Sequence, residues 1–164
     1  MIDFFHFKWV TEPSLSDKRF GIVDDGSISY TKRDGDEDDW DALVMNPQEK
    51  EVQFVPVDHH ILVYESGNER SMCDGMLYTS NHDYVSFIEI KDRKEKWIEE
   101  AIGQLESTIA VFIANHADTA KGNRYAFACN PQHPQFAFSK MQRMQQFYHK
   151  YGFRLFVQRE ILVR

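Results

Sequence analysis

The chain has 164 residues, of which 42% are hydrophobic, 14% aromatic and 27% charged. This composition excludes a disordered or fibrous protein and predicts one globular domain over residues 1–164. The two cysteines, Cys73 and Cys129, lack the spacing of a disulfide framework or a zinc knuckle, and no apolar stretch approaches the ~20 residues of a membrane span. We therefore expect a cytoplasmic protein that has no membrane partner.

The formal net charge of -7 is unevenly distributed along the chain. Residues 121–164 contain eight basic side chains and one acid, Glu160, and carry +7, so the first 120 residues carry -14. This asymmetry suggests two faces with different partners, and an unevenly charged solvated surface is the simpler interpretation. The six acids between Asp34 and Asp41 predict a solvated loop. A regulatory, DNA-mimicking or protein-binding role for that segment is the alternative.

Residues 1–60 are predicted to form a β-rich N-terminal extension. An Asp25-Gly26 turn signal predicts a hairpin, because glycine accepts the positive φ of a tight turn. Pro56 marks an edge or a break of a strand, and Ser66 to Asn68 is a turn. The strands predicted up to residue 65 are Phe4–Val10, Phe20–Asp24, Ser27–Thr31, Val52–Val57 and Ile61–Glu65.

Residues 60–164 are predicted to form the core of the protein. Apolar spacing of three to four residues predicts two helices, Arg93–Asn115 and Phe136–Tyr151, the second with Tyr148 on its core side and Gly152 as its stop. Strands are predicted at Met76–Thr79, Tyr84–Lys91, Tyr125–Cys129 and Phe153–Val157, with a continuation of the last to Val163 left open. This order predicts an α/β (α+β) fold with a central mixed sheet flanked by helices.

Candidate catalytic residues lie on the predicted hairpin in the middle of the chain. Glu89 and Lys91 are two residues apart at the end of a strand, so their side chains share one face while Ile88 and Ile90 face the other way. A same-face ion pair is the simplest interpretation of that spacing. Asp74 lies in the preceding strand, where the hairpin places it across from Glu89 or one pair away.

Two carboxylates beside a lysine form an oxygen-rich site that suits a hard divalent cation, Mg²⁺ or Mn²⁺. Such an ion polarises a phosphodiester and activates water, while the lysine orients that water or stabilises developing negative charge. The residue types therefore suffice for phosphodiester hydrolysis, with Asp74 and Glu89 as metal ligands.

Asp74 followed by Glu89-Ile90-Lys91 at a strand end resembles the signature of the PD-(D/E)XK, or restriction-endonuclease-like, nuclease superfamily. The stretch FIEIKDR with its Trp-containing helix is similar to uncharacterised bacterial members of that group. The resemblance covers roughly residues 70–129 and implies a restriction-endonuclease-like core. It also implies a metal-dependent nuclease whose partner is a nucleic acid, DNA in the first place.

The resemblance implies further site residues. Gln104 matches a glutamine that supports the site or the attacking water in some branches, and Ile90 would supply its backbone carbonyl to the metal. The residue before Asp74 is Cys73 where the superfamily commonly has proline. The helix glutamate that many members carry has no clear equivalent; the candidates are Glu49, Glu51, Glu65 and Glu69.

The basic C-terminal segment is the candidate nucleic-acid surface, through contacts with phosphates. Cutting both strands of a duplex would be easiest for a two-fold homodimer, so a homodimer is a candidate assembly. A non-catalytic module on the same fold, with the acidic Asp34–Asp41 segment facing a protein partner, is the alternative function. The proposed phosphate contacts are Lys140, Arg143, Lys150, Arg154 and Arg159.

Overall fold

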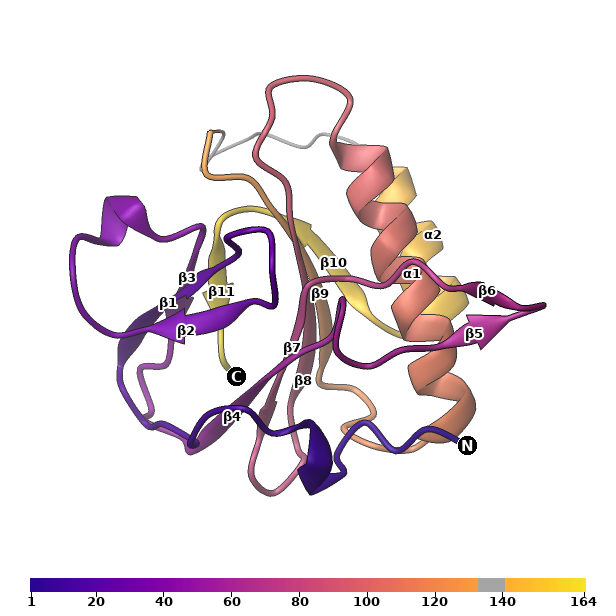
Figure 1. Ribbon diagram of the computed structural model, residues 1–164, viewed down its shortest axis with the longest axis horizontal. Coiled ribbons are helices and arrows are strands. Elements are labelled where there is room, and N and C mark those ends of the chain that lie inside the picture. The colour runs from indigo at the N-terminus through magenta and orange to yellow at the C-terminus, as the bar shows by residue number, and fades with distance from the viewer. Residues whose placement is uncertain (133–140) are drawn as a thin grey trace.

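A computed structural model describes residues 1–132 and 141–164 of the chain (Figure 1). The 3₁₀ helices η1 and η2 span Phe7–Trp9 and Glu37–Asp39, and the α-helices α1 and α2 span Ile98–Asn115 and Met141–Tyr151. The strands are β1 Arg19–Val23, β2 Tyr30–Lys32, β3 Ala42–Met45, β4 Val52–Pro56, β5 Tyr64–Glu65, β6 Asn68–Glu69, β7 Gly75–Thr79, β8 Val85–Ile90, β9 Arg124–Cys129, β10 Arg154–Val157 and β11 Glu160–Leu162.

The larger sheet within the described residues has the strand order β10-β9-β8-β7-β4. β8, β9 and β10 run parallel to one another, whereas β7 is antiparallel to both β8 and β4. The parallel connections pass through α1 and α2, which supply the long crossovers that parallel strands need. The fold is therefore mixed α/β, as the order of the predicted elements indicated.

The second sheet has the strand order β11-β3-β1-β2 and draws on both ends of the chain. β10 ends at Val157, and the chain then crosses to pair β11 with β3 in parallel instead of continuing one strand to Val163. Arg159 fixes this crossing, because its guanidinium donates to the Trp40 carbonyl at 3.0 Å. β4, although it precedes residue 60, belongs to the larger sheet.

The larger sheet lies between the two α-helices and the second sheet (Figure 1). An apolar cluster covers each of its faces. Phe87 of β8 packs with Phe112 of α1 on the helical face, and Ile88 packs in the cluster that contains Ile161 on the face of the second sheet. Because side chains alternate along a strand, Glu89 lies on the same face as Phe87 and is directed towards α1. This alternation sets the position of the candidate site.

The N-terminal segment forms no strand, so the predicted strand Phe4–Val10 is wrong. Of its aromatic side chains, Phe4 enters the core, Phe5 and Trp9 pack against it, and Phe7 is exposed. Phe4 is fully buried, contacts Phe112 edge-to-face at 5.6 Å, and donates its backbone N–H to His116 Nε2 at 3.0 Å. The pattern of aromatic and polar residues resembles that of a strand, but the chain here forms only the 3₁₀ helix η1 and buries a single ring fully.

The first helix begins at Ile98, five residues later than the predicted start at Arg93. Lys96 has a φ of 54°, outside the helical region, and the Arg93 carbonyl accepts a hydrogen bond from Asn130 Nδ2 at 2.7 Å. Residues 91–97 therefore form a loop that joins β8 to α1. The helical spacing of apolar residues could not predict this loop, because the hydrogen bond from Asn130, which is distant in the sequence, holds Arg93 in a non-helical position.

The second helix is described from Met141, and the predicted helical residues 136–140 lie outside the described residues. Gly152, with a φ of 70°, ends it as expected. The core side was predicted wrongly, since Phe147 is fully buried and Tyr148 is 46% exposed. Phe147 and Tyr148 are adjacent in the sequence and point to different faces of the helix. The packing of α2 against α1 and β10 determines which of the two faces is buried.

The shorter predictions have mixed outcomes. The β1–β2 hairpin is confirmed, with Val23 paired to Tyr30 and Gly26 at a φ of 95°. Of the predicted strand Ile61–Glu65, only Tyr64–Glu65 is a strand, and it turns back into β6. Most of the Asp34–Asp41 segment is exposed, while Trp40 is buried.

Across residues 1–132 and 141–164, none of the helices is apolar over a length that would cross a bilayer.

A close contact between the second sheet and the acidic segment gives a stability prediction. A Cβ at Gly21 would lie 2.3 Å from the Trp40 ring, whereas a Cβ at Gly103 of α1 would meet nothing within 4 Å. Gly21→Ala should therefore lower the free energy of unfolding by about 1–3 kcal/mol or more. Gly103→Ala, the matched control, should raise it by roughly 1 kcal/mol. Urea unfolding measures both, and an unchanged midpoint for Gly21→Ala contradicts the contact.

Candidate active site

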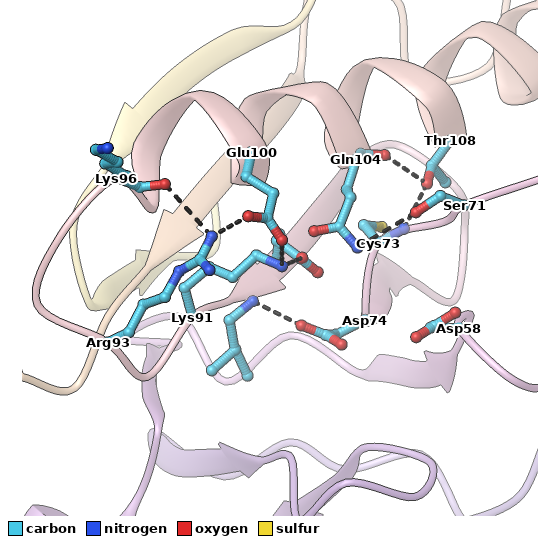
Figure 2. A network of polar contacts seen from close by, with 12 residues as sticks. Asp58, Ser71, Cys73, Asp74, Lys91, Arg93, Lys96, Glu100, Gln104 and Thr108 are labelled. Carbon is cyan, nitrogen blue, oxygen red and sulfur yellow. Dashed lines mark hydrogen bonds and ion pairs between the residues drawn. The ribbon is translucent and has the colours of Figure 1, made fainter.

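The β7–β8 hairpin brings Asp74 and Glu89 together. The last registered pair is Gly75 with Ile88, so Asp74 and Glu89 face each other one position further along. Asp74 Oδ2 accepts the backbone N–H of Ile90 at 2.6 Å, which fixes this carboxyl at the end of the hairpin (Figure 2). The Asp74 carbonyl accepts hydrogen bonds from the Val57 amide and the Ser29 hydroxyl. The predicted juxtaposition of the two acids is confirmed.

The two carboxyl groups differ in exposure, with Glu89 buried and Asp74 partly buried. Glu89 is 1% exposed, and burial is the main reason that the pKa of Glu89 and the pKa of Asp74 are both raised. The Asp74 charge raises the pKa of Glu89 further, and Lys91 opposes this. The adjacent negative charges therefore favour a state in which the pair holds one proton, with Glu89 as the protonated member.

Lys91 completes the predicted trio and has a second partner. Its Nζ lies 3.1 Å from Glu89 Oε2 and 3.1 Å from Glu100 Oε1, and its side chain is 16% exposed. The Lys91 backbone N–H donates to the Cys129 carbonyl at 2.9 Å, so the residue is held at the C-terminal end of the central strand β8. The ammonium is therefore positioned between the side chains of Glu89 and Glu100.

Gln104 extends from α1 towards these groups (Figure 2). Its Nε2 donates to Ser71 Oγ at 3.4 Å, and its Oε1 is buried without a hydrogen-bond partner among the described residues. Thr108, one turn further along α1, accepts the backbone N–H of Cys73 at 2.7 Å. This bond connects α1 to the residue before Asp74, so the helix and the hairpin keep a fixed relation.

The sequence analysis missed Glu100, Arg93 and Asp58 as neighbours of the site. Glu100 is four residues before Gln104 and so shares its helical face, a signal that could have identified it. Arg93 lies in the irregular loop before α1 and forms an ion pair with Glu100. The sequence pattern could not predict this contact, because the loop has no regular spacing of side chains. Asp58 lies beside Asp74 (Figure 2), because the end of β4 adjoins the start of antiparallel β7. Asp58 adds to the rise in the Asp74 pKa, and burial raises its own pKa.

The donor set fits a divalent cation that keeps part of its water shell. Glu89 Oε1 is buried and has no hydrogen-bond donor among the described side chains, so it is free to ligate a cation. No cluster of three or more His, Cys, Asp or Glu side chains suitable for a metal occurs within residues 1–132 and 141–164. Mg²⁺ is commonly held by one or two carboxylates together with water and substrate phosphate, which Asp74 and Glu89 match.

The structure does not bring the predicted basic residues into this cluster. Arg143 pairs with Glu106 at 2.8 Å and with Glu99 at 3.7 Å. Arg154 is registered with Tyr125 at the start of β9, whereas the other end of β9 lies beside Ile90. Lys150 lies over the Tyr151 ring, Arg159 binds backbone carbonyls, and Lys140 lies outside the described residues. Phosphate contacts by these residues stay a prediction.

The candidates for the helix glutamate do not join the site either. Glu65 pairs with Arg70 at 2.7 Å, and Glu51 accepts the Ser14 hydroxyl at 2.8 Å. Glu69 lies in the exposed strand β6, and Glu49 lies in the turn after β3 with a φ of 52°. The glutamate that contacts Lys91 from a helix is Glu100, which lies on α1 after the hairpin.

Comparison with known proteins identifies no relative: no protein-family model, curated protein or solved structure matches this chain significantly.

Proposed function

We propose that this protein is a metal-dependent nuclease that hydrolyses phosphodiester bonds of nucleic acid, in the first place DNA, with a PD-(D/E)XK-type site. The observation that carries the proposal is the buried Glu89 opposite the partly buried Asp74, with the Lys91 ammonium 3.1 Å from Glu89. Strongly perturbed carboxyls next to a specific charged partner are typical of functional sites. A purely structural Lys91–Glu89 ion pair would need neither the second acid opposite it nor a buried Glu89 oxygen that receives no hydrogen bond from a donor group.

The arrangement of elements supports a restriction-endonuclease-like core. The hairpin β7–β8 carries the three polar residues, α1 follows, and β9 then pairs in parallel with β8. This is the order that the resemblance implies for residues 70–129. Strands β1, β2, β3 and β11 form the second sheet, which packs on the face of the larger sheet that is opposite the helices.

Each side chain of the site has a distinct task in the proposed reaction. Asp74 and Glu89 would hold Mg²⁺ or Mn²⁺, which would supply a Lewis acid to polarise the phosphodiester and lower the pKa of a bound water. The Lys91 ammonium stabilises negative charge that develops on the phosphate oxygens. Gln104 Oε1, which is buried and lacks a donor, can accept a hydrogen bond from the attacking water and orient it. The Ile90 carbonyl is a further proposed ligand, next to the amide that binds Asp74.

The proposal predicts hydrolysis that depends strictly on a divalent metal. Purified protein should cleave plasmid DNA with millimolar Mg²⁺ or Mn²⁺, and excess EDTA should abolish the cleavage, because Asp74 and Glu89 alone cannot polarise the phosphodiester. A gel assay with plasmid DNA and single-stranded RNA in parallel measures activity and substrate class together. Cleavage that persists in EDTA contradicts the proposal.

Calorimetric titration with Mn²⁺ separates this proposal from the non-catalytic alternative. Wild-type protein should bind the ion and Asp74→Asn should not, whereas the exposed control Asp118→Asn should bind as the wild type does. Absence of Mn²⁺ binding by the wild type, together with absence of cleavage, favours an interaction module with the acidic Asp34–Asp41 segment as its protein-binding face.

A further inference from the structure

The Glu100 carboxylate is shared by two cations at the mouth of the site. Its Oε1 lies 3.1 Å from Lys91 Nζ, and its Oε2 is ion-paired with Arg93 Nη2. Figure 2 shows the carboxylate between the ammonium and the guanidinium, with Gln104 one turn further along the same helix. Two basic side chains thus converge on one anion, and this anion belongs to the protein.

The loop that carries these cations is anchored at both of its ends and at the Arg93 carbonyl. The Lys91 N–H donates to the Cys129 carbonyl, and the Arg93 carbonyl accepts from Asn130, which is 1% exposed. Trp97 at the other end is 3% exposed in the core beneath α1. The backbone positions of the two cations are therefore determined before any ligand arrives, and this lowers the ordering cost of binding.

The charge of the loop contrasts with that of its surroundings. Residues 91–96 contain four basic side chains and two acids, within the first 120 residues that carry -14. The side chains of Arg93 and Glu100 are 47% and 52% exposed. Ion pairs with such exposure contribute little to stability, so another anion can replace Glu100 at low cost.

We propose that Lys91 and Arg93 form the binding site for a backbone phosphate of the substrate, and that Glu100 occupies this site as an intramolecular competitor until the phosphate displaces it. A phosphate offers the guanidinium two acceptor oxygens in the geometry that a carboxylate offers. The inference rests on the proposed function for the identity of the anion. Glu100 then regulates substrate affinity and Arg93 positions the substrate strand.

Fluorescence anisotropy with a labelled duplex oligonucleotide in EDTA tests this inference without cleavage. Glu100→Gln removes the competing charge and should tighten binding about fivefold. Arg93→Gln should weaken binding about fivefold and reduce the slope of log K against log salt by roughly one, as expected for one lost phosphate contact. When Arg93→Gln is already present, adding Glu100→Gln should tighten binding much less, because Glu100 then pairs with only one cation, Lys91.

The ion pair Arg19–Glu37 is a matched control, since its side chains are 45% and 42% exposed. Arg19→Gln and Glu37→Gln should leave the affinity and its salt dependence close to the wild type. Unchanged or weaker binding by Glu100→Gln overturns the competitor role, and so does an improvement that Glu37→Gln reproduces. If Glu100 only positions Lys91, its replacement lowers kcat in the metal-dependent assay and leaves affinity unchanged, which equally overturns the proposal.

The two proposals can be separated by these measurements. Absence of cleavage by the wild type, with the expected opposite shifts for Arg93→Gln and Glu100→Gln, supports the phosphate site and contradicts the nuclease. Metal-dependent cleavage with no affinity shift in either variant contradicts the phosphate site alone. Absence of oligonucleotide binding by the wild type in EDTA overturns the inference whatever the cleavage assay shows.

Discussion

Replacing Lys91 with alanine should lower kcat for metal-dependent cleavage by a factor on the order of 10²–10⁴. The ammonium lies 3.1 Å from Glu89 and is only 16% exposed, so its charge acts in a site that water screens weakly. The measurement is the initial rate of plasmid or oligonucleotide cleavage at saturating Mg²⁺. Lys121→Ala, a substitution at an exposed lysine after α1, should keep the wild-type rate.

The same assay distinguishes loss of function from loss of fold. Glu89→Ala should also abolish cleavage, and both variants should keep cooperative unfolding and the wild-type circular dichroism spectrum, because the hairpin backbone is held by its own ladder and by the apolar layers. A Lys91→Ala protein that is folded and cleaves at the wild-type rate rules out the assigned site.

Glu89→Gln should stabilise the metal-free protein while it abolishes cleavage. Burial and the charge of Asp74 raise the pKa of Glu89 above its unfolded value of about 4.3. Wild-type Glu89 therefore takes up a proton on folding. This contribution to stability is fully present below about pH 4 and is lost as the pH rises towards the raised folded pKa. Glutamine does not titrate, so the advantage of the variant should grow with pH and reach roughly 2–4 kcal/mol at pH 8.

Thermal and urea unfolding in EDTA at pH 5 and pH 8 measure this difference. Glu99→Gln, at a side chain that is 60% exposed, is the matched control and should change stability little at either pH. Excess Mn²⁺ should reverse the order at pH 8, because an ion bound by Glu89 stabilises only the wild type. A Glu89→Gln protein that is less stable than the wild type at pH 8 in EDTA contradicts the buried, proton-sharing pair.

Those features of the fold that depend on near neighbours could be predicted from the sequence. The β7–β8 hairpin, with its polar turn and apolar strands, has the predicted partners and places Asp74 opposite Glu89. Alternation in β8 correctly separated Glu89 from Ile88 and Ile90, because a strand has a side-chain period of two.

The wrong predictions concern segments whose local pattern is overruled by distant contacts. Phe4 alternates with polar residues as a strand would, yet its amide binds His116 and its ring enters the core. The helical pattern before Ile98 is interrupted by the bond from Asn130 to Arg93. Tyr148 and Phe147 fit the helical period about equally well, and only the position of α2 against the sheet decides which is buried.

The residues of the candidate site also fall into two groups, those that near neighbours in the sequence predict and those that depend on distant contacts. Asp74, Glu89 and Lys91 could be identified from the sequence alone, since one hairpin carries all three and its register follows from the strand pattern and the turn. Glu100, Arg93 and Asp58 enter the site through a loop, a helix face and a neighbouring strand, whose relative positions depend on packing. The sequence by itself determined the mixed α/β class, the acid pair and its lysine. Only the tertiary structure showed that Glu100 pairs with Lys91 and that Arg93 is the second cation beside it. Both contacts join the β8–α1 loop to helix α1, and the packing of these two elements does not follow from the local sequence pattern.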